Sequence, residues 1–223
     1  FSLFTENSDY TDDTVLTMAV AEALLKDRPF DMMIQHFARR YPNRGYGGMF
    51  RKWAYNNGER VAYNSYGNGS AMRLLPIPLF FNDLTQVLRF AVKQSACTHN
   101  HEDSLDASML LAHTIFLARS VKSKSDIYKT ISKRYGYEYK EPGDEETRKH
   151  SLHSITGVHE ALNAFFKGSD FVSVLRESIK YGGDSDTIAA CSCAIAYVFY
   201  EKIPQDLIDR VWLMLPEQFR QII

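Results

Sequence analysis

Apolar residues recur at intervals of three and four positions along most of the chain, which is the spacing of one helix face. Residues 15–26 show this spacing directly after a polar start, as expected at a helix N-terminus. The same spacing predicts helices at 28–40, 83–95, 104–121, 125–134, 151–166, 170–181, 188–200 and 205–215. Alternating strand patterns are weak, with 60–64 as the best candidate. We therefore predict a single all-α domain that covers residues 1–223.

Glycine, proline and clustered charges separate these helices. Residues 64–73 form a predicted glycine-rich loop, and an apolar segment at 74–81 follows through two prolines. The aromatic segment 47–57 is a candidate for a short helix. Residues 122–150 are the most polar stretch, which we interpret as a loop that holds only the short helix at 125–134.

Composition narrows the class of protein. The 223 residues are 45% hydrophobic, enough for a substantial core, and 26 basic against 27 acidic residues give a net charge of −1. This balance gives no reason to expect nucleic acid or an anionic membrane as a partner. The longest apolar run, 188–200, is too short to span a bilayer.

The cysteines and the start of the sequence bear on location. Three cysteines are an odd number, and Cys191 and Cys193 lie in an apolar run among alanines, where a free thiol behaves as a small hydrophobe. No basic-then-apolar leader opens the sequence. We therefore expect a reduced, cytoplasmic protein.

Two short acidic clusters stand near opposite ends of the chain, each before an apolar helical run. The first is Thr-Asp-Asp-Thr at 11–14, and the second is Gly-Gly-Asp-Ser-Asp-Thr at 182–187. If the fold brings them together, four carboxylates repel one another unless cations neutralise them. Oxygen ligands of this kind suit Mg²⁺ or Mn²⁺ better than zinc. The pair of clusters therefore predicts a metal-dependent enzyme.

Either cluster alone is more simply explained as a helix N-cap, because Asp, Ser and Thr are favoured there. Three features favour a shared site. Adjacent aspartates exceed the needs of one cap, and the Asp-Ser-Asp-Thr spacing directs alternate oxygens to one side. Gly182 and Gly183 also allow a close approach of the backbone.

Two segments between the clusters have two interpretations each. Residues 68–70 (Asn-Gly-Ser) could present consecutive backbone N–H groups to phosphate oxygens, or could form an ordinary Asn-Gly turn. Residues 98–103 (Thr-His-Asn-His-Glu-Asp) hold two histidines that suggest zinc. However, no further Cys or His group completes a tetrahedral set, and the start of a solvated helix explains them equally well.

Together, four segments resemble the ADP-ribosylglycohydrolase family, and they occur in the order found in that family. They are Tyr-Thr-Asp-Asp-Thr at 10–14, Gly-Asn-Gly-Ser-Ala-Met-Arg at 67–73, Thr-His at 98–99 and Gly-Gly-Asp-Ser-Asp-Thr at 182–187. The similarity extends from residue 10 to near the C-terminus and includes an Ile-Pro pair at 203–204.

The resemblance implies a compact orthogonal helical bundle with two Mg²⁺ ions, or Mn²⁺, beside an ADP-ribose cleft. Carried over to this sequence, the metal ligands are Thr11, Asp12, Asp13, Asp184, Asp186 and Thr187. Asp12 or Asp13 is the expected catalytic residue, which orients the attacking water or accepts its proton. The expected substrate-binding residues are Asn68, Gly69 and Ser70 at the diphosphate, together with His99 and Gly183.

The implied activity is metal-dependent removal of ADP-ribose from a modified protein side chain, arginine first, by attack of water at the anomeric carbon. The alternatives are a non-catalytic ADP-ribose-binding or structural member of the family and a hydrolase of small ADP-ribose conjugates. Members of the family usually begin with a further helical segment that carries a Gly-Asp signature and often a glutamate near the metals. Only ten residues precede the first cluster here, so we expect this chain to lack that segment.

Overall fold

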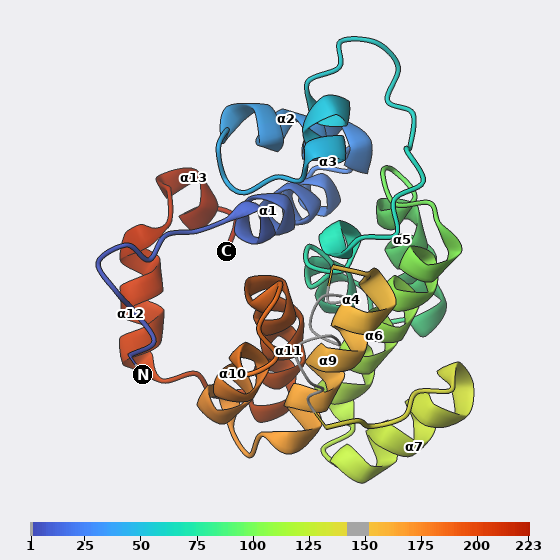
Figure 1. The fold of residues 1–223 in the computed structure, drawn as a ribbon, viewed down its shortest axis with the longest axis vertical. Coiled ribbons are helices and arrows are strands. Elements are labelled where there is room, and N and C mark those ends of the chain that lie inside the picture. Colours follow the sequence, from blue (N-terminus) through green and yellow to red (C-terminus); the bar gives the residue numbers. More distant parts are fainter. Residues whose placement is uncertain (1, 142–151) are drawn as a thin grey trace.

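The computed structural model describes residues 2–141 and 152–223, and the regular structure in these ranges is helical (Figure 1). The elements are α1 (Asp12–Leu25), α2 (Phe30–Arg40), α3 (Gly48–Ala54), the 3₁₀ turn η1 (Asn68–Ser70), α4 (Pro76–Phe80), α5 (Leu84–Ser95), α6 (Glu102–Ser120), α7 (Lys124–Tyr135), α9 (Ser154–Lys167), α10 (Phe171–Ile179), α11 (Ser185–Tyr200), α12 (Gln205–Met214) and α13 (Glu217–Arg220). The all-α prediction is confirmed.

The weak strand candidate at 60–64 is wrong, because this segment has no regular structure. In the described ranges, the β-type contact is an isolated bridge between Gly67 and His153. Residues 142–151 lie outside these ranges. They include part of the predicted polar loop and the predicted start of the helix at 151–166.

Two helices begin one turn earlier than the apolar pattern indicates. α1 begins at Asp12 rather than residue 15, and α11 begins at Ser185 rather than residue 188. The first turns hold Asp12 and Asp13 in α1 and Asp186 in α11, and the positive end of the helix dipole stabilises negative charge there. The two acidic clusters therefore include the first turns of these helices. We call residues 11–13 the first acidic turn and residues 184–187 the second acidic turn.

α6 lies at the centre of the fold and packs against α5, α9 and α11. Its side chains at Ala107, Ala112 and Ile115 are fully buried. α10 packs on α9 and α11, while α1 packs on α2 and also touches α4 and α11. In Figure 1, α1–α3 form the upper part of the molecule and α9–α11 the lower part, with α4–α6 along one side. The two acidic turns thus come from different parts of the bundle.

The C-terminal helices lie along the other side of the molecule (Figure 1). Phe219 of α13 is fully buried and packs against the rings of Tyr10, Phe37 and Tyr41. α12 has no buried residue, and the segment before α1 runs beside it, where Arg210 lies over the Phe4 ring at 5.5 Å. Packing of Tyr10 against Phe219 therefore anchors the chain directly before the first acidic turn.

Two further features concern membrane helices and cysteines. Across the ranges that the structure describes, every helix is too short or too polar to cross a membrane. Cys97, Cys191 and Cys193 all have free thiols.

Candidate active site

The first acidic turn is held by the loop that follows α2. Thr11 precedes α1 in an extended conformation, and Asp12 and Asp13 are the first two helical residues. The backbone N–H of Asp12 donates to the carbonyl of Arg44 at 2.7 Å, and the Thr11 hydroxyl donates to Asp13 Oδ2 at 3.2 Å. Gly45 lies so close that a Cβ there would be 3.0 Å from Asp12 Oδ1. The loop at 44–45 therefore holds the backbone of Asp12, and glycine at position 45 leaves room for its carboxylate.

The second acidic turn is set up by two glycines. Gly182 and Gly183 have φ angles of +66° and +56°, a left-handed conformation that glycine adopts without strain. They turn the chain from α10 into α11. Asp184 is the N-cap of α11, Asp186 lies in its first turn, and the side chain of Thr187 is buried.

The two acidic turns lie close enough to influence each other's charges. Burial raises the pKa of Asp13 to about 7, and the charges of Asp186, Asp12 and Asp184 add to this effect. Burial likewise raises the pKa of Asp12 to about 6, with contributions from Asp186 and Asp184. The pKa of Asp184 is also raised, mainly by burial. The fold thus brings the four carboxylates named from the sequence into one neighbourhood.

A divalent cation suits the chemistry of this neighbourhood. Asp13 is 7% exposed, and its Oδ1 is buried with no hydrogen-bond partner in the described part of the chain. Such an oxygen carries a desolvation cost that a cation offsets. Among residues 2–141 and 152–223, no three Asp, Glu, His or Cys side chains stand close enough to form a ready-made metal site. The donors fit Mg²⁺ or Mn²⁺ in type, and their like charges repel when no cation is bound.

Asn68 connects the glycine loop to the second acidic turn. Its Nδ2 donates to Asp184 Oδ2 at 2.8 Å. Its other side packs on α9 at Gly157, where a Cβ would come within 2.5 Å of Asn68 Oδ1. Any larger residue at position 157 would displace Asn68, so this glycine allows the loop to reach Asp184.

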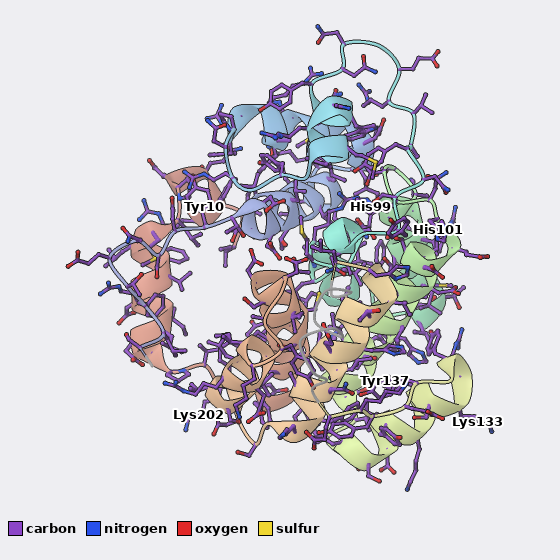
Figure 2. All side chains as sticks on the ribbon, in the orientation of Figure 1. Tyr10, His99, His101, Lys133, Tyr137 and Lys202 are labelled. Atoms are coloured by element: carbon purple, nitrogen blue, oxygen red, sulfur yellow. The ribbon has the colours of Figure 1, made fainter. Side chains whose placement is uncertain are left out.

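His99 lies directly beside the glycine loop. It is 4% exposed, and Figure 2 shows it next to the chain that leads into α4. Its ring atoms Cε1 and Nε2 would both lie 2.9 Å from a Cβ at Gly69. The Ser70 hydroxyl, by contrast, is fully buried and lies 3.4 Å from the hydroxyl of Ser108 in α6. Ser70 therefore directs its side chain into the core, and its backbone belongs to the loop.

Replacing Gly69 by alanine is expected to lower the free energy of unfolding by about 1–2 kcal/mol, because the new Cβ would overlap the His99 ring. Gly48→Ala is the matched control, since a Cβ at this first residue of α3 meets nothing within 4 Å. Thermal unfolding of both variants measures the effect. Equal values for both variants would contradict the close packing of Gly69 on His99.

Of the two histidines at 98–103, His101 has a structural role. Its Nδ1 accepts the backbone N–H of Asp103 at 3.2 Å, so it caps the N-terminus of α6. This contact supports the interpretation of the segment as a helix start.

Glu160 of α9 is a buried carboxyl that the motifs did not identify. It is 7% exposed, and its Oε2 has no hydrogen-bond partner among the described residues. Burial raises its pKa to about 7, and the charge of Asp184 contributes. It follows Gly157 by one turn, on the helix face that meets Asn68. The sequence signal is a glutamate in register with the small residues at 157, 161 and 164.

The chain is similar to known proteins over almost all of its length. The sequence model of the ADP-ribosylglycohydrolase family matches residues 3–222. A solved structure described as an "ADP-ribosylglycohydrolase-related protein complex" superposes with a TM-score of 0.72 at 22% identity, over 95% of this chain and 77% of that one. This structure supports the fold.

Several curated proteins are similar in sequence. The ADP-ribosylhydrolase ARH3 of Gallus gallus is 36% identical over 131 residues, which cover 51% of this chain and 36% of the relative. The Bos taurus protein of the same name is 29% identical, over 90% of this chain and 73% of the relative. The ADP-ribosyl-[dinitrogen reductase] glycohydrolase of Rhodospirillum rubrum is 24% identical, over 95% and 76%. The match to the chicken protein thus spans about a third of that relative's length.

Proposed function

Because the chain belongs to the ADP-ribosylglycohydrolase family, we propose that it hydrolyses the bond between ADP-ribose and a modified protein side chain, with a divalent cation as cofactor. The observation that supports this most directly is the meeting of the two acidic turns beside the loop at 68–70. The relative from Rhodospirillum rubrum, named for a protein substrate, favours a protein over a small conjugate. We take arginine as the first linkage to test.

The proposed cofactor is a pair of Mg²⁺ ions, with Mn²⁺ as the substitute. The ligands would be Thr11, Asp12, Asp13, Asp184, Asp186 and Thr187. When bound, such ions neutralise the carboxylates and lower the pKa of a bound water. The orphaned Oδ1 of Asp13 supports this assignment.

The remaining steps fall to side chains and loops of the protein. Asp12 or Asp13 would orient the attacking water and accept its proton. The loop at 68–70, Gly183 and His99 would hold the diphosphate, so that the anomeric carbon lies over the acidic turns. Water supplies a hydroxyl group to that carbon as its bond to the side-chain nitrogen breaks. The nitrogen takes up a proton, and free ADP-ribose and unmodified arginine are the products.

The test uses the purified chain, a protein carrying ADP-ribosylarginine, and MgCl₂ or MnCl₂. We expect multiple turnovers of free ADP-ribose, measured by chromatography, and loss of the activity in EDTA that returns when Mg²⁺ is added in excess. A parallel arm with ADP-ribosylserine protein and small conjugates decides the linkage. Binding of ADP-ribose without turnover under any divalent ion would instead identify a non-catalytic binding protein.

The cellular location that we propose is the cytoplasm, on the evidence of three free cysteines. Two of them, Cys191 and Cys193, have a pKa raised by burial in α11, which keeps them as unreactive thiols.

A further inference from the structure

The side chain of Arg73 is fully buried directly after the glycine loop. Its Nε donates to Gln94 Oε1 at 2.7 Å, and its Nη2 donates to the carbonyl of Gln94 at 3.1 Å and to Thr98 Oγ1 at 2.9 Å. These partners are all neutral, and in the described ranges no carboxylate forms an ion pair with Arg73. A buried guanidinium that is held in this way keeps its positive charge inside the protein, close to the glycine loop.

The Thr98 hydroxyl links this cation to His99. Its Oγ1 lies 2.7 Å from His99 Nδ1, and both residues are buried. A guanidinium can only donate, so Thr98 Oγ1 acts as an acceptor toward Arg73 and has its own proton free for His99. The Tyr63 phenol also lies beside Thr98, and burial raises its pKa to about 12, so it is a neutral phenol. The Thr98 hydroxyl can therefore donate its proton to Nδ1 of His99.

The other ring nitrogen of His99 faces the glycine loop. Nε2 would lie 2.9 Å from a Cβ at Gly69 and 4.0 Å from a Cβ at Gly67. Burial and the charge of Arg73 lower the pKa of His99 to about 3, so the ring is neutral at physiological pH. A neutral ring that accepts at Nδ1 carries its single proton on Nε2.

We propose that Arg73 and Thr98 are positioning residues that hold His99 as the neutral Nε2–H tautomer, with its one N–H donor directed at the glycine loop. An anionic ligand at the loop of residues 67–70 would then meet the neutral Nε2–H donor of His99, and Arg73 would add a positive charge at longer range. The identity of that ligand as the diphosphate of ADP-ribose rests on the proposed function. The assignment of the His99 tautomer does not rest on the proposed function.

Removing the Thr98 hydroxyl should remove the hydrogen bond that holds His99 in one tautomer. In Thr98→Val the shape of the side chain is nearly kept, but Nδ1 loses its donor, so the proton redistributes between the two ring nitrogens. Affinity for ADP-ribose should fall about tenfold, close to the loss of one good hydrogen bond to a charged group. Thr98→Ser keeps the hydroxyl and should keep both the tautomer and the affinity.

Nitrogen NMR of histidine-labelled protein measures the tautomer, with the His99 signals assigned by their absence in His99→Asn. We expect wild type and Thr98→Ser to show a bare Nδ1 and a protonated Nε2, and Thr98→Val to show a mixture. A proton on Nδ1 in wild type, or an unchanged tautomer in Thr98→Val, would overturn the proposal. The wild-type spectrum decides this even if the valine variant does not fold.

Calorimetry with ADP-ribose separates this inference from the proposed function. A tenfold loss in Thr98→Val with recovery in Thr98→Ser supports the role of the tautomer in binding. A changed tautomer with unchanged affinity would remove that role. If wild type shows the expected tautomer but does not bind ADP-ribose, the proposed function fails, and the assignment of the His99 tautomer stands.

Discussion

Asp184→Ala is expected to abolish release of ADP-ribose, with turnover lowered at least about a thousandfold, because several kcal/mol of charge stabilisation is lost with one ligand of the proposed ions. Asp184 also accepts the hydrogen bond from Asn68, so the substitution removes the contact between the glycine loop and the second acidic turn. Free ADP-ribose measured over time with excess Mg²⁺ gives the rate. Turnover within tenfold of wild type would exclude Asp184 from the active centre.

A second variant and a control separate chemistry from stability. Asp184→Asn can keep the contact with Asn68 through its own amide oxygen while it removes one of the repelling charges. In EDTA at neutral pH this variant should therefore unfold at a higher temperature than wild type, and it should gain less from added Mg²⁺. Asp126→Ala is the matched control, since Asp126 is an exposed aspartate in the first turn of α7. It should change neither turnover nor the response to Mg²⁺.

In the absence of divalent ions, the stability of the protein is expected to fall as the pH rises from about 4 to about 8. Burial raises the pKa of Glu160 from its ordinary value of 4.5 to about 7. Between these values the folded state binds more protons than the unfolded state, so the free energy of unfolding decreases with pH. The penalty is absent below pH 4.5 and complete above pH 7. Asp12 and Asp13 act in the same direction.

Glu160→Gln isolates one contribution to this dependence. The variant should unfold about 4–8 °C higher than wild type at pH 8 in EDTA, corresponding to about 2 kcal/mol, and should match wild type near pH 4.5. Thermal unfolding followed by circular dichroism at several pH values measures the difference. Glu217→Gln, a change at an exposed position, serves as the control. A shift that is the same at pH 4.5 and pH 8 would show that Glu160 does not carry the raised pKa.

The helical fold could be predicted because its elements are mostly amphipathic and end at clear signals. α5, for example, follows Asp83, which caps it by accepting the N–H of Gln86. Apolar spacing indicates the starts of α1 and α11 a turn too late, because it cannot mark a polar first turn such as those at Asp12 and Ser185. α13 is a single turn, too short to show a period, so it was not predicted.

The candidate site could be predicted only where its residues stand together in short motifs. The carboxylates of both acidic turns and Asn68 belong to such motifs, and the structure brings them together. Glu160 is isolated in sequence, so its proximity to Asp184 becomes visible only when α9 is packed. The same holds for Gln94, whose amide contacts Arg73 and the carbonyl of Ser70. Long-range pairing of single polar residues has no local pattern to detect.

The hydrogen bond between Asn68 and Asp184 joins positions that are 116 residues apart. α5 and α6, by contrast, are neighbours in the chain and pack on each other. Contacts between neighbouring helices close small loops and form early in folding, whereas a contact across so long a stretch of chain waits until most of the bundle has assembled. The bond should therefore be among the last to form during refolding, and in a nascent chain the proposed cation-binding centre should not exist until α11 has docked.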